Sequence, residues 1–361
     1  MEKVKKVRIA VAGFGCYGRT FAKLFQIHPD VEYVGICETN SELIAQAQAA
    51  GFTRIHGDYR DVLAGDEYDA VHIALPVENH VKPTLDVLAA GKHCACAVPM
   101  AFTLEEIRSI VAAERAARKN YMMMETIVYS PEYLFVKDLF ARGDMGRLQF
   151  MHGWHYQDME DWPGGWKGMP PMWYATHAVS ALLDLPKSRA TRVIGFGSGI
   201  MRDELTGFHG NPFPAETMTF QIENSNAVAE VSRILFETAV VYSESFELYG
   251  SKASFFSRTG ELVRLLKHEN GSRGTPINVS KPEIGDLYAL EKLPADFRDA
   301  IIKIKGRPVY AGPANEFIRS IVEKRKSAID AVTAANWCAV GICAHESAMA
   351  GGKIVDVPRF D

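Results

Sequence analysis

The stretch VRIAVAGFGCYG, residues 7–18, decides the fold of this 361-residue chain. Its first half is a short apolar run, which predicts a buried β-strand. Its second half follows the pattern G-x-G-x-x-G, and helical spacing of Phe21, Leu24 and Phe25 comes next. A glycine loop that joins a strand to a helix in this way is typical of a dinucleotide-binding Rossmann unit.

The three glycines have different roles. Gly13 permits the tight turn, Gly15 lets the backbone approach a pyrophosphate, and Gly18 lets the helix pack closely on the strand. The first N–H groups of the helix are available to phosphate oxygens. We therefore expect the whole loop to bind a dinucleotide: Gly13, Phe14, Gly15, Cys16, Tyr17 and Gly18.

The second predicted strand, residues 31–37, ends at Glu38. An acid about 20 residues after the glycines is expected to accept hydrogen bonds from the adenosine ribose. A 2′-phosphate would meet a like charge there, and Thr39, Asn40 and Ser41 offer no cation. The sequence therefore predicts NAD rather than NADP, with Glu38 and Thr39 in the cofactor site.

Strands and helices alternate up to residue 125, with further strands at 70–75, 93–97 and 121–124. This alternation predicts an α/β unit with a doubly wound parallel sheet that binds its ligand at the carboxyl ends of the strands. His80 fits either a place near the nicotinamide or a capping or packing role. The cofactor site is expected to include the residues at those strand ends: Leu75, Pro76, His80, Ala97, Val98, Pro99 and Glu125.

After residue 125 the pattern changes to successive strand-like runs with few helices between them, at 190–197, 216–222, 227–236, 243–249 and 254–258. This predicts an α+β domain with a large, open, mostly antiparallel sheet. We expect two domains, 1–125 for NAD binding and 126–361 for substrate binding. Residues 270–282 are rich in Gly, Ser and Pro and predict a surface loop.

Charge and composition limit the partners. The net charge is −4 and no strongly basic cluster occurs, so neither nucleic acid nor an anionic membrane is expected. No apolar run reaches the ~18 residues of a membrane span. The six cysteines show no secreted framework, which favours free thiols and a cytoplasmic location.

Four of the five tryptophans fall close together, interleaved with tyrosines and carboxylates. Flat aromatic faces beside carboxylates suit a polyhydroxylated ligand such as a sugar, although an aromatic loop packed on the sheet or on another subunit remains an alternative. The expected substrate-binding residues are Trp154, Asp158, Trp162, Trp166, Trp173 and Thr176.

His177 follows this aromatic segment in the sequence MWYATHA. A neutral imidazole can take the proton of a sugar hydroxyl while hydride leaves the same carbon. Tyr156 and Tyr174 are candidates for orienting or relaying the proton, but rank below His177 because a phenol has a pKa of ~10. A structural histidine and packed tyrosines are the alternatives.

A metal site is not expected. His152, His155, Asp158, Glu160 and Asp161 lie close in sequence, but their spacing matches no zinc motif. Hydride transfer to NAD needs no metal, so a solvated acidic loop is the better interpretation.

Four segments in order, VAGFGCYG, ALPVENH, GKHCACAVPMA and FELYGSKASF, resemble the Gfo/Idh/MocA family (glucose–fructose oxidoreductase / inositol dehydrogenase). The resemblance implies an N-terminal Rossmann domain, a C-terminal domain whose open sheet forms oligomer contacts, and NAD(P)-linked oxidation or reduction of sugars and cyclitols. We therefore expect a small-molecule sugar or glycoside as substrate and a homo-oligomer.

The chain departs from the usual family pattern. Ala97-Val98-Pro99 stands where members usually carry Glu-Lys-Pro, and Trp173 stands where an Asp precedes the His by four residues. Val-Pro together with Tyr-x-Thr-His, here Tyr174 to His177, is similar to glycoside 3-oxidoreductases and NAD-dependent redox glycosidases. Ala97 replaces the Glu of the glycosidases. Val98 would keep the nicotinamide pocket dry.

This resemblance implies an oxidoreductase that oxidises the C3 hydroxyl of a sugar or glycoside to a 3-keto sugar. One alternative is a redox-neutral glycosidase that recycles NAD. Another is a dinucleotide-binding protein without catalysis, which the missing lysine favours and the retained His177 disfavours.

Overall fold

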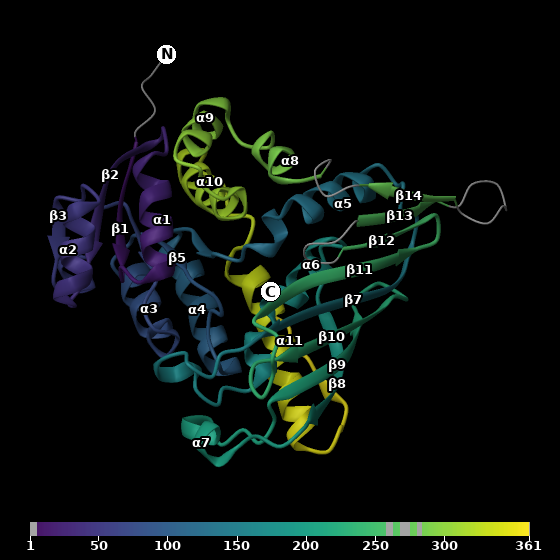
Figure 1. Ribbon diagram of the computed structural model, residues 1–361. Coiled ribbons are helices and arrows are strands. Elements are labelled where there is room, and N and C mark those ends of the chain that lie inside the picture. The colour runs from purple at the N-terminus through teal and green to yellow at the C-terminus, as the bar shows by residue number, and fades with distance from the viewer. Residues whose placement is uncertain (1–5, 258–262, 268–274, 280–283, 361) are drawn as a thin grey trace. The chain divides into compact units, whose positions relative to one another are not determined.

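The computed structural model describes residues 6–257, 263–267, 275–279 and 284–360 (Figure 1). The chain divides into two compact units. Unit 1 comprises Met1–Thr126, Leu290–Ala335 and Phe360–Asp361, and unit 2 comprises Ile127–Ala289 and Asn336–Arg359.

The first break lies within a residue of the predicted boundary, but the assignment of all later residues to one domain was wrong. Leu290–Ala335 belongs to unit 1. The helix α10 (Pro308–Val322) packs there, with the Tyr310 ring centroid 6.0 Å from that of Phe21. Asn120 also donates a hydrogen bond to Ser320 at 2.8 Å. Helical periodicity predicts a buried face, but not the unit that buries it.

Unit 1 contains a six-stranded parallel sheet of the predicted doubly wound kind, in the order β3-β2-β1-β4-β5-β6. Its central strands β1, β4 and β5 are mostly apolar and buried because helices cover both faces. The order reverses between β1 and β4, where such folds bind their ligands. The strands are β1 (Val7–Ala12), β2 (Val31–Cys37), β3 (Arg54–His56), β4 (Ala70–Ile73), β5 (His93–Cys96) and β6 (Tyr121–Met123).

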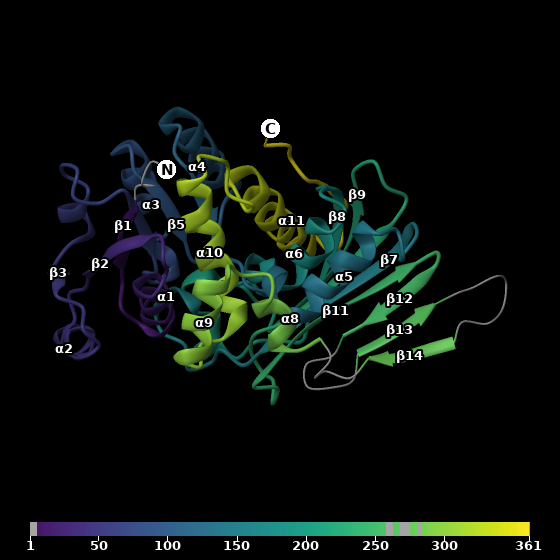
Figure 2. The same ribbon diagram turned by 90° about the horizontal axis from the view of Figure 1, so that it is seen from above.

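Local capping by side chains fixes the starts of two helices in unit 1, α2 and α4. Asn40 accepts hydrogen bonds from two backbone N–H groups at the start of α2, and Thr103 with Glu106 forms a capping box at the start of α4. Figure 2 shows α10 beside α9. The helices are α1 (Cys16–Gln26), α2 (Ser41–Ala49), α3 (Val81–Ala89), α4 (Leu104–Ala117), α9 (Ala295–Lys303) and α10.

Unit 2 contains a nine-stranded sheet in the order β14-β13-β12-β11-β7-β10-β9-β8-β15. All its pairs are antiparallel except β7 with β10, which confirms the predicted mostly antiparallel sheet. Figure 2 shows β12, β13 and β14 following one another towards one edge. The strands are β7 (Leu148–Gln157), β8 (Ala190–Ser198), β9 (Ala215–Ile222), β10 (Val228–Ile234), β11 (Tyr242–Gly250), β12 (Ala253–Phe256), β13 (Val263–Lys267), β14 (Thr275–Val279) and β15 (Val355–Asp356).

The surface loop predicted for residues 270–282 is wrong at its centre, where residues 275–279 form β14. This strand lies at the edge of the sheet, and an edge strand tolerates a proline such as Pro276 because one of its sides needs no ladder hydrogen bonds. The remaining positions of that prediction lie outside the described residues.

Helices cover one face of the unit 2 sheet at close range. A Cβ atom at Gly153 of β7 would lie 2.5 Å from the carbonyl oxygen of Ala178, and one at Gly195 of β8 would lie 2.4 Å from that of Ala344. Glycine is therefore required where these helices cross the strands. The α-helices of this part of the chain are α5 (Pro131–Ala141), α6 (Thr176–Asp184), α7 (Asp203–Thr206), α8 (Asp286–Leu290) and α11 (Ala331–Met349).

The structure bears on two expectations from the sequence: that the cysteines are free thiols and that no segment spans a membrane. The six cysteines are free thiols, and all but Cys16 are buried. Within the described ranges, none of the helices combines the length and the apolar character that crossing a bilayer requires.

Candidate cofactor site and active site

The glycine loop of unit 1 has the geometry of a phosphate-binding turn. Gly13 adopts φ +95°, and a Cβ atom there would lie 2.5 Å from the Ala74 carbonyl oxygen. A Cβ at Gly18 would lie 2.0 Å from the Gly13 carbonyl oxygen, whereas one at Gly15 would meet no atom within 4 Å. Gly13 and Gly18 are thus required by packing, while the backbone at Gly15 faces open space, as close approach of a pyrophosphate requires.

Glu38 is held beside this loop by backbone donors. Its Oε2 accepts a hydrogen bond from the Phe14 N–H at 2.8 Å. Its Oε1 accepts from the N–H groups of Thr39 and Asn40 at 2.8 and 2.9 Å. Three donors fix the carboxylate next to the start of α1, and its remaining lone pairs suit ribose hydroxyls. The ribose role of Glu38 stays a prediction.

His80 joins two of the predicted cofactor loops. Its Nδ1 lies 2.8 Å from the Pro99 carbonyl oxygen and its Nε2 lies 3.1 Å from that of Leu75. Burial by itself would lower the pKa of His80, but neighbouring Cys96 and the two carbonyl oxygens outweigh it and raise the pKa to about 9. A protonated His80 can therefore donate to both carbonyl oxygens and so link the loop after β4 to the turn after β5.

Of the other predicted cofactor residues, some form an apolar surface and others make hydrogen bonds that hold the elements of unit 1 together. Ala97 and Val98 are buried and give the turn after β5 an apolar surface. Tyr17 donates a hydrogen bond from its hydroxyl to the Met124 carbonyl at 2.6 Å and so fastens α1 to the end of β6. Cys16 is exposed at the start of α1. Glu125 is buried, and its Oε1 accepts from the Thr126 N–H at 2.7 Å.

In unit 2, ionisable side chains form a row across four neighbouring strands on the face that α6 covers. Glu244 of β11 pairs in register with His155 of β7, His155 with Arg233 of β10, and Arg233 with Glu216 of β9. Residues paired in register share one face of a sheet. Gly153, two positions before His155, contacts α6, so the whole row lies on that face. We call these four residues the polar row.

Arg233 is the fully buried cation of the polar row. Its Nε donates to the Tyr174 carbonyl at 2.6 Å, and one of its terminal nitrogens donates to the His155 carbonyl at 2.8 Å. Its guanidinium carbon lies 4.7 Å from the centroid of the Tyr174 ring, which is a cation–π contact. Arg233 thereby fixes the position of Tyr174 through both its backbone and its ring.

Glu216 supports the segment that leads into α6. Its carboxylate is buried, accepts a hydrogen bond from the Met172 N–H at 2.8 Å, and lies 2.7 Å from Nδ1 of His345. The same segment carries Tyr174 and ends at His177. Two members of the polar row, Glu216 and Arg233, therefore make hydrogen bonds to the backbone of the segment that carries the candidate catalytic residues.

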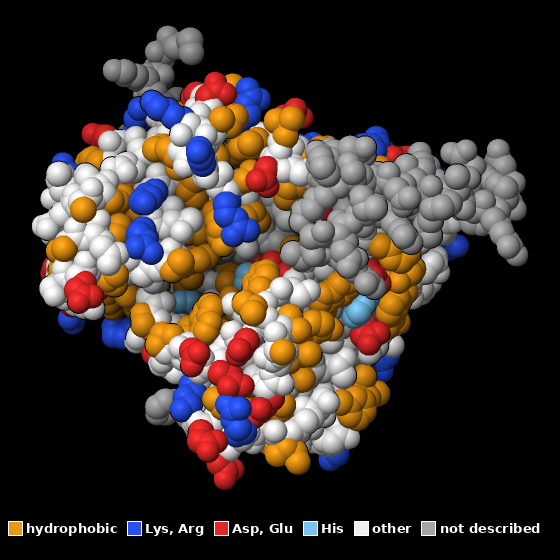
Figure 3. All heavy atoms as spheres, viewed as in Figure 1, with side chains coloured by type: hydrophobic (Ala, Val, Ile, Leu, Met, Phe, Trp, Pro, Cys, Tyr) orange, Lys and Arg blue, Asp and Glu red, His pale blue; other side chains and the backbone are white. Residues whose placement is uncertain are grey.

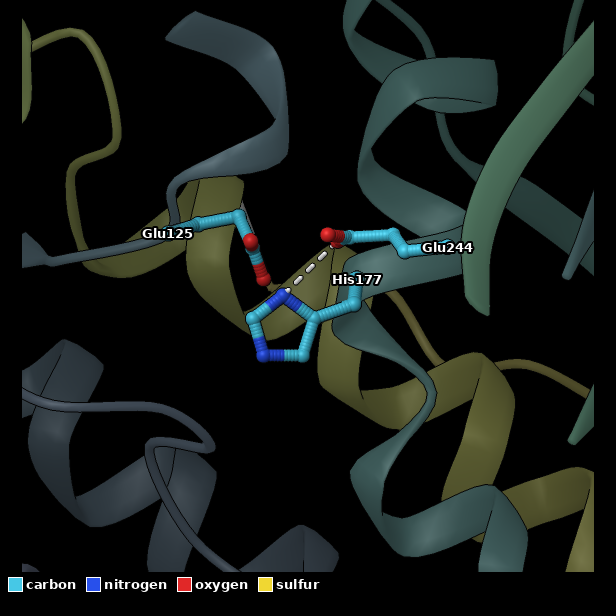
Figure 4. A group of neighbouring side chains, drawn as sticks. All are labelled: Glu125, His177 and Glu244. Atoms are coloured by element: carbon cyan, nitrogen blue, oxygen red, sulfur yellow. Dashed lines mark ion pairs between the residues drawn. The ribbon is translucent and has the colours of Figure 1, made fainter. Parts of the chain in front are cut away.

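His177 is the second residue of α6 and contacts groups at both ring nitrogens. Its Nε2 lies 2.8 Å from the Tyr174 hydroxyl. Its Nδ1 lies 3.2 Å from Oε1 of Glu244, the pair joined by a dashed line in Figure 4. Glu244 also accepts a hydrogen bond from the Tyr242 hydroxyl at 2.6 Å. Glu125, which Figure 4 also draws, belongs to unit 1.

The surroundings set the protonation of the flanking groups. Burial and the positive charge of Arg233 hold the pKa of His155 well below its usual value, so its ring is neutral. Desolvation and the adjacent Glu244 carboxylate raise the pKa of Tyr242 above its usual value, so its phenol stays protonated.

An unbroken series of ring contacts runs through the site. Centroid distances are 5.3 Å for Trp162–Trp166, 4.8 Å for Trp166–Tyr174 and 5.0 Å for Tyr174–His177. The series continues from His177 to His155 at 4.8 Å and from His155 to Tyr242 at 5.0 Å. Trp162 and Tyr242, at its ends, are 38% and 48% exposed, whereas the rings between Tyr174 and His155 are buried. Flat apolar faces therefore reach solvent on either side of the His177–Tyr174 pair.

Other predicted site residues are not brought to His177. Trp154 and Tyr156 alternate with His155 and so lie on the opposite face of the sheet. The Tyr156 hydroxyl lies 2.7 Å from that of Ser232, and Trp154 donates to Ser243 at 3.3 Å.

Trp173, Asp158 and Thr176 also have local roles. The Trp173 ring packs against His209 and His345, with centroids 5.5 and 5.7 Å apart. Asp158 accepts from the Glu160 N–H at 3.1 Å and so closes its own turn. Thr176, next to His177, is buried.

The loop that carries Trp162 is cross-linked to its surroundings. Glu160 lies 2.5 Å from Arg202 and accepts a hydrogen bond from the Glu237 N–H at 3.0 Å. The Asp158 N–H donates to the Val240 carbonyl at 3.0 Å. Figure 3 shows acidic and basic side chains gathered in the region of α7. Asp158 and Glu160 thus serve as structural ties of this loop.

Sequence reasoning missed Glu244, Arg233 and Tyr242. A signal was present: Glu244 and Arg233 occupy positions that the period-2 pattern of β11 and β10 assigns to the buried face. A charged residue at a buried strand position is rarely tolerated without a partner, so such positions point to a polar site.

Residues 7–125 match the model of the Gfo/Idh/MocA family, described as an oxidoreductase family with an NAD-binding Rossmann fold. The match is confined to the Rossmann part of the chain. The match confirms the resemblance to Gfo/Idh/MocA proteins and NAD as the cofactor of the fold.

Curated relatives match a smaller part of the chain. Glycosyl hydrolase family 109 proteins of Shewanella sp. (strain W3-18-1) and Shewanella baltica (strain OS155) are 30% identical over 184 residues. The match covers 46% of this chain and 40% of each relative. The matched region thus spans less than half the length of these proteins.

Solved structures resemble the fold over nearly the whole chain, each covering 98% of it. Myo-inositol 2-dehydrogenase from Lactobacillus plantarum superposes with a TM-score of 0.75 at 16% identity. Levoglucosan dehydrogenase in complex with NADH and levoglucosan gives 0.76 at 18%. A NAD binding oxidoreductase from Klebsiella pneumoniae gives 0.81 at 15%. These likenesses confirm the predicted architecture of Rossmann unit and open sheet.

Proposed function

We propose that this protein is a NAD-dependent oxidoreductase that oxidises a sugar or glycoside, and that the hydroxyl it oxidises is the one at C3. The observation that carries the proposal is the contact of 2.8 Å between His177 Nε2 and the Tyr174 hydroxyl, which are buried beside a tryptophan pair whose outer member, Trp162, is exposed. Unit 1 supplies the cofactor site of an oxidoreductase family.

Oxidation of a secondary alcohol removes a hydride from carbon and a proton from oxygen. When bound, NAD accepts the hydride. The proton needs a base, and His177 with Tyr174 is suited to this because an imidazole ionises near neutral pH. The Ala97–Val98 turn of unit 1 is apolar, so it adds no base of its own to the cofactor site.

The aromatic side chains support a polyhydroxylated ring as substrate. Trp162 and Trp166 offer flat faces on which the C–H faces of a sugar pack. The names of two structural neighbours, myo-inositol 2-dehydrogenase and levoglucosan dehydrogenase, contain compounds that are polyhydroxylated rings of this kind. The Val-Pro turn and the Tyr174–His177 sequence support C3 through their resemblance to glycoside 3-oxidoreductases.

A second candidate function is redox-neutral cleavage of a glycoside with recycled NAD. The observation that favours it is the name of the curated relatives, glycosyl hydrolase family 109 proteins. A ketone at C3 acidifies the neighbouring C–H bond, so the same His177–Tyr174 site fits the first step of such cleavage.

One assay separates these functions. The protein is incubated with NAD⁺ and paired methyl and nitrophenyl glycosides of several sugars, and NADH and nitrophenol are followed together. Stoichiometric NADH with no nitrophenol supports the oxidoreductase. Nitrophenol release at catalytic NAD⁺ supports the glycosidase. Tight NAD binding without turnover across the panel would instead support a non-catalytic dinucleotide-binding protein.

A further inference from the structure

We infer that Glu244 is a positioning residue for His177, and that it makes the Tyr174 oxygen the atom that first receives the substrate proton. This inference rests on the proposed function, since it assigns the proton path of that reaction. It differs from the sequence-based expectation, in which His177 was the base and Tyr174 ranked below it.

The argument starts with the carboxylate of Glu244. It accepts a hydrogen bond from the Tyr242 hydroxyl at 2.6 Å through Oε2, and its Oε1 lies 3.2 Å from His177 Nδ1 as an ion-pair contact. An ionised carboxylate has no proton to donate. A carboxylate oxygen beside a ring nitrogen favours an N–H group over a lone pair at that nitrogen, so we place the ring proton of neutral His177 on Nδ1, next to Glu244.

The tautomer fixes the direction of the next hydrogen bond. With the proton on Nδ1, Nε2 of His177 carries a lone pair and can only accept. The Tyr174 hydroxyl, 2.8 Å away, must then be the donor. Its oxygen has spare lone pairs, so a substrate hydroxyl can donate to it while its own proton points to His177.

The remaining groups around this path favour charge separation along it. The side chains of His177 and Glu244 are 10% and 13% exposed, so their interaction is weakly screened by water. The cation of Arg233 lies at the Tyr174 ring and carbonyl, at the other end of the path from Glu244. His155, which contacts the His177 ring, is neutral.

The step balances as follows. The substrate O–H bond breaks and its proton joins the Tyr174 oxygen, while the Tyr174 proton moves to Nε2 of His177. The electron pair of the broken O–H bond forms the second carbon–oxygen bond, while the C–H electron pair leaves with the hydride, which bound NAD⁺ would accept and so be reduced. His177 becomes an imidazolium opposite Glu244, and its proton is released to water after the ketone leaves.

The chain provides a matched control on the same strand. Glu247 of β11 accepts a hydrogen bond from the Tyr249 hydroxyl at 2.9 Å and lies 4.0 Å from Nδ1 of His152. It lies three residues after Glu244 and pairs with His152 in register, so this Tyr–Glu–His group faces the opposite side of the sheet. Glu247→Gln removes the same charge from the same strand.

The test compares Glu244→Gln, Glu244→Asp, Glu247→Gln, Tyr174→Phe and the double variant Glu244→Gln/Tyr174→Phe on the best substrate from the panel. Glu244→Gln should lower kcat about 100-fold, with KM and the Kd of NAD changed less than about twofold. Glu244→Asp should regain at least about tenfold of that loss, and Glu247→Gln should behave as wild type. The double variant should be no slower than Tyr174→Phe, because both changes break one path.

A kcat for Glu244→Gln within about threefold of wild type, or additive losses in the double variant, would overturn the inference. A second measurement needs no substrate: ¹⁵N NMR of the histidine rings, with the His177 signals assigned from His177→Gln. Protonation at Nδ1 in the wild type is expected, and protonation at Nε2 overturns the inference. The observed tautomer of His177 therefore tests the role of Glu244 even if no glycoside in the panel is oxidised and the proposed function fails.

Discussion

Buried histidines in unit 1 take opposite charge states because their neighbours differ. Burial lowers the pKa of His28 to about 4 and that of His72 to about 3. His80 is as deeply buried, yet Cys96 and two carbonyl oxygens raise its pKa to about 9. A sequence identifies each of these residues as histidine, but only the contacts decide which of them carries charge at neutral pH.

The charge on His80 predicts an alkaline loss of stability. Its pKa lies above the unfolded value of 6.5, so its stabilising contribution is complete below about pH 6.5 and is lost as the pH rises through about 9. The melting temperature of the wild type should therefore fall between pH 7 and pH 9.5. Scanning fluorimetry of wild type and His80→Gln across this range measures the effect.

The His80→Gln variant provides the control for that fall. A neutral amide cannot be deprotonated in this range, so its melting temperature should start lower at pH 6.5 and approach that of the wild type near pH 10. Melting curves that stay parallel over the whole range would contradict the assigned charge of His80.

Replacement of His177 should affect chemistry rather than cofactor binding. His177→Gln removes the group that takes the proton from Tyr174, and we expect kcat to fall by about 10²–10⁴-fold. The Kd of NAD should change less than about twofold, because the cofactor loops belong to unit 1. NADH absorbance and calorimetric titration measure the two quantities. His152→Gln, on the outer face of the sheet, serves as the unaffected control, and an unchanged kcat for His177→Gln would exclude this residue as the base.

Two glycines of the glycine loop, Gly18 and Gly15, have different roles: one is needed for packing and the other leaves space for a ligand. Gly18 packs against the Gly13 carbonyl, while Gly15 has open space around its Cα. Both glycines belong to the same motif, and a motif alone cannot distinguish which of them the fold needs in the absence of ligand.

This difference predicts opposite effects for two alanine substitutions. Gly18→Ala places a Cβ 2.0 Å from the Gly13 carbonyl oxygen and should destabilise the protein by about 3 kcal/mol. Gly15→Ala meets no atom within 4 Å, so its stability should remain within about 1 kcal/mol of wild type while its NAD affinity falls at least about tenfold. Urea unfolding and calorimetry measure both. Equal loss of stability in the two variants would show that the loop geometry is wrong.

Elements with strong local patterns were predictable from the sequence. The run VRIAVA, the glycine loop and the alternation that follows led to the Rossmann sheet, because hydrophobic period and turn residues act over a few neighbours. His177 and Tyr174 could be selected for the same reason, since both lie in one short segment. Glu244 and Arg233 could be singled out one at a time as charged residues at buried strand positions. The row that they form with Glu216 could not be predicted, because only the register of separate strands creates it.

The outer face of the unit 2 sheet carries aromatic side chains. The ring of Tyr249 lies 5.7 Å from that of Phe150 and 5.4 Å from that of Phe256. An open sheet face with clustered aromatics fits contact with another copy of the chain. The sequence-based expectation of a homo-oligomer through this sheet stays a prediction.

That expectation can be tested at the aromatic cluster. Tyr249→Lys places a charge in its centre and should convert the oligomer to smaller species, because an unpaired charge is costly in an apolar interface. Light scattering after size-exclusion chromatography measures the mass. Ile200→Lys, which alters a side chain that is 89% exposed in the loop after β8, should leave the mass unchanged. If light scattering gives the wild-type protein the mass of a monomer, the prediction of a homo-oligomer is wrong.

The return of α9 and α10 to unit 1 has a consequence for how the protein is made. A ribosome releases the segment up to Thr126 long before Leu290–Ala335, and this late segment supplies the Tyr310 and Ser320 contacts of the Rossmann unit. Newly synthesised β1–β6 must therefore persist with an apolar flank uncovered while strands β7 to β14 of the second sheet emerge. Chaperone dependence during translation, and insolubility of a fragment cut after Thr126, are the costs that this interleaved chain order implies.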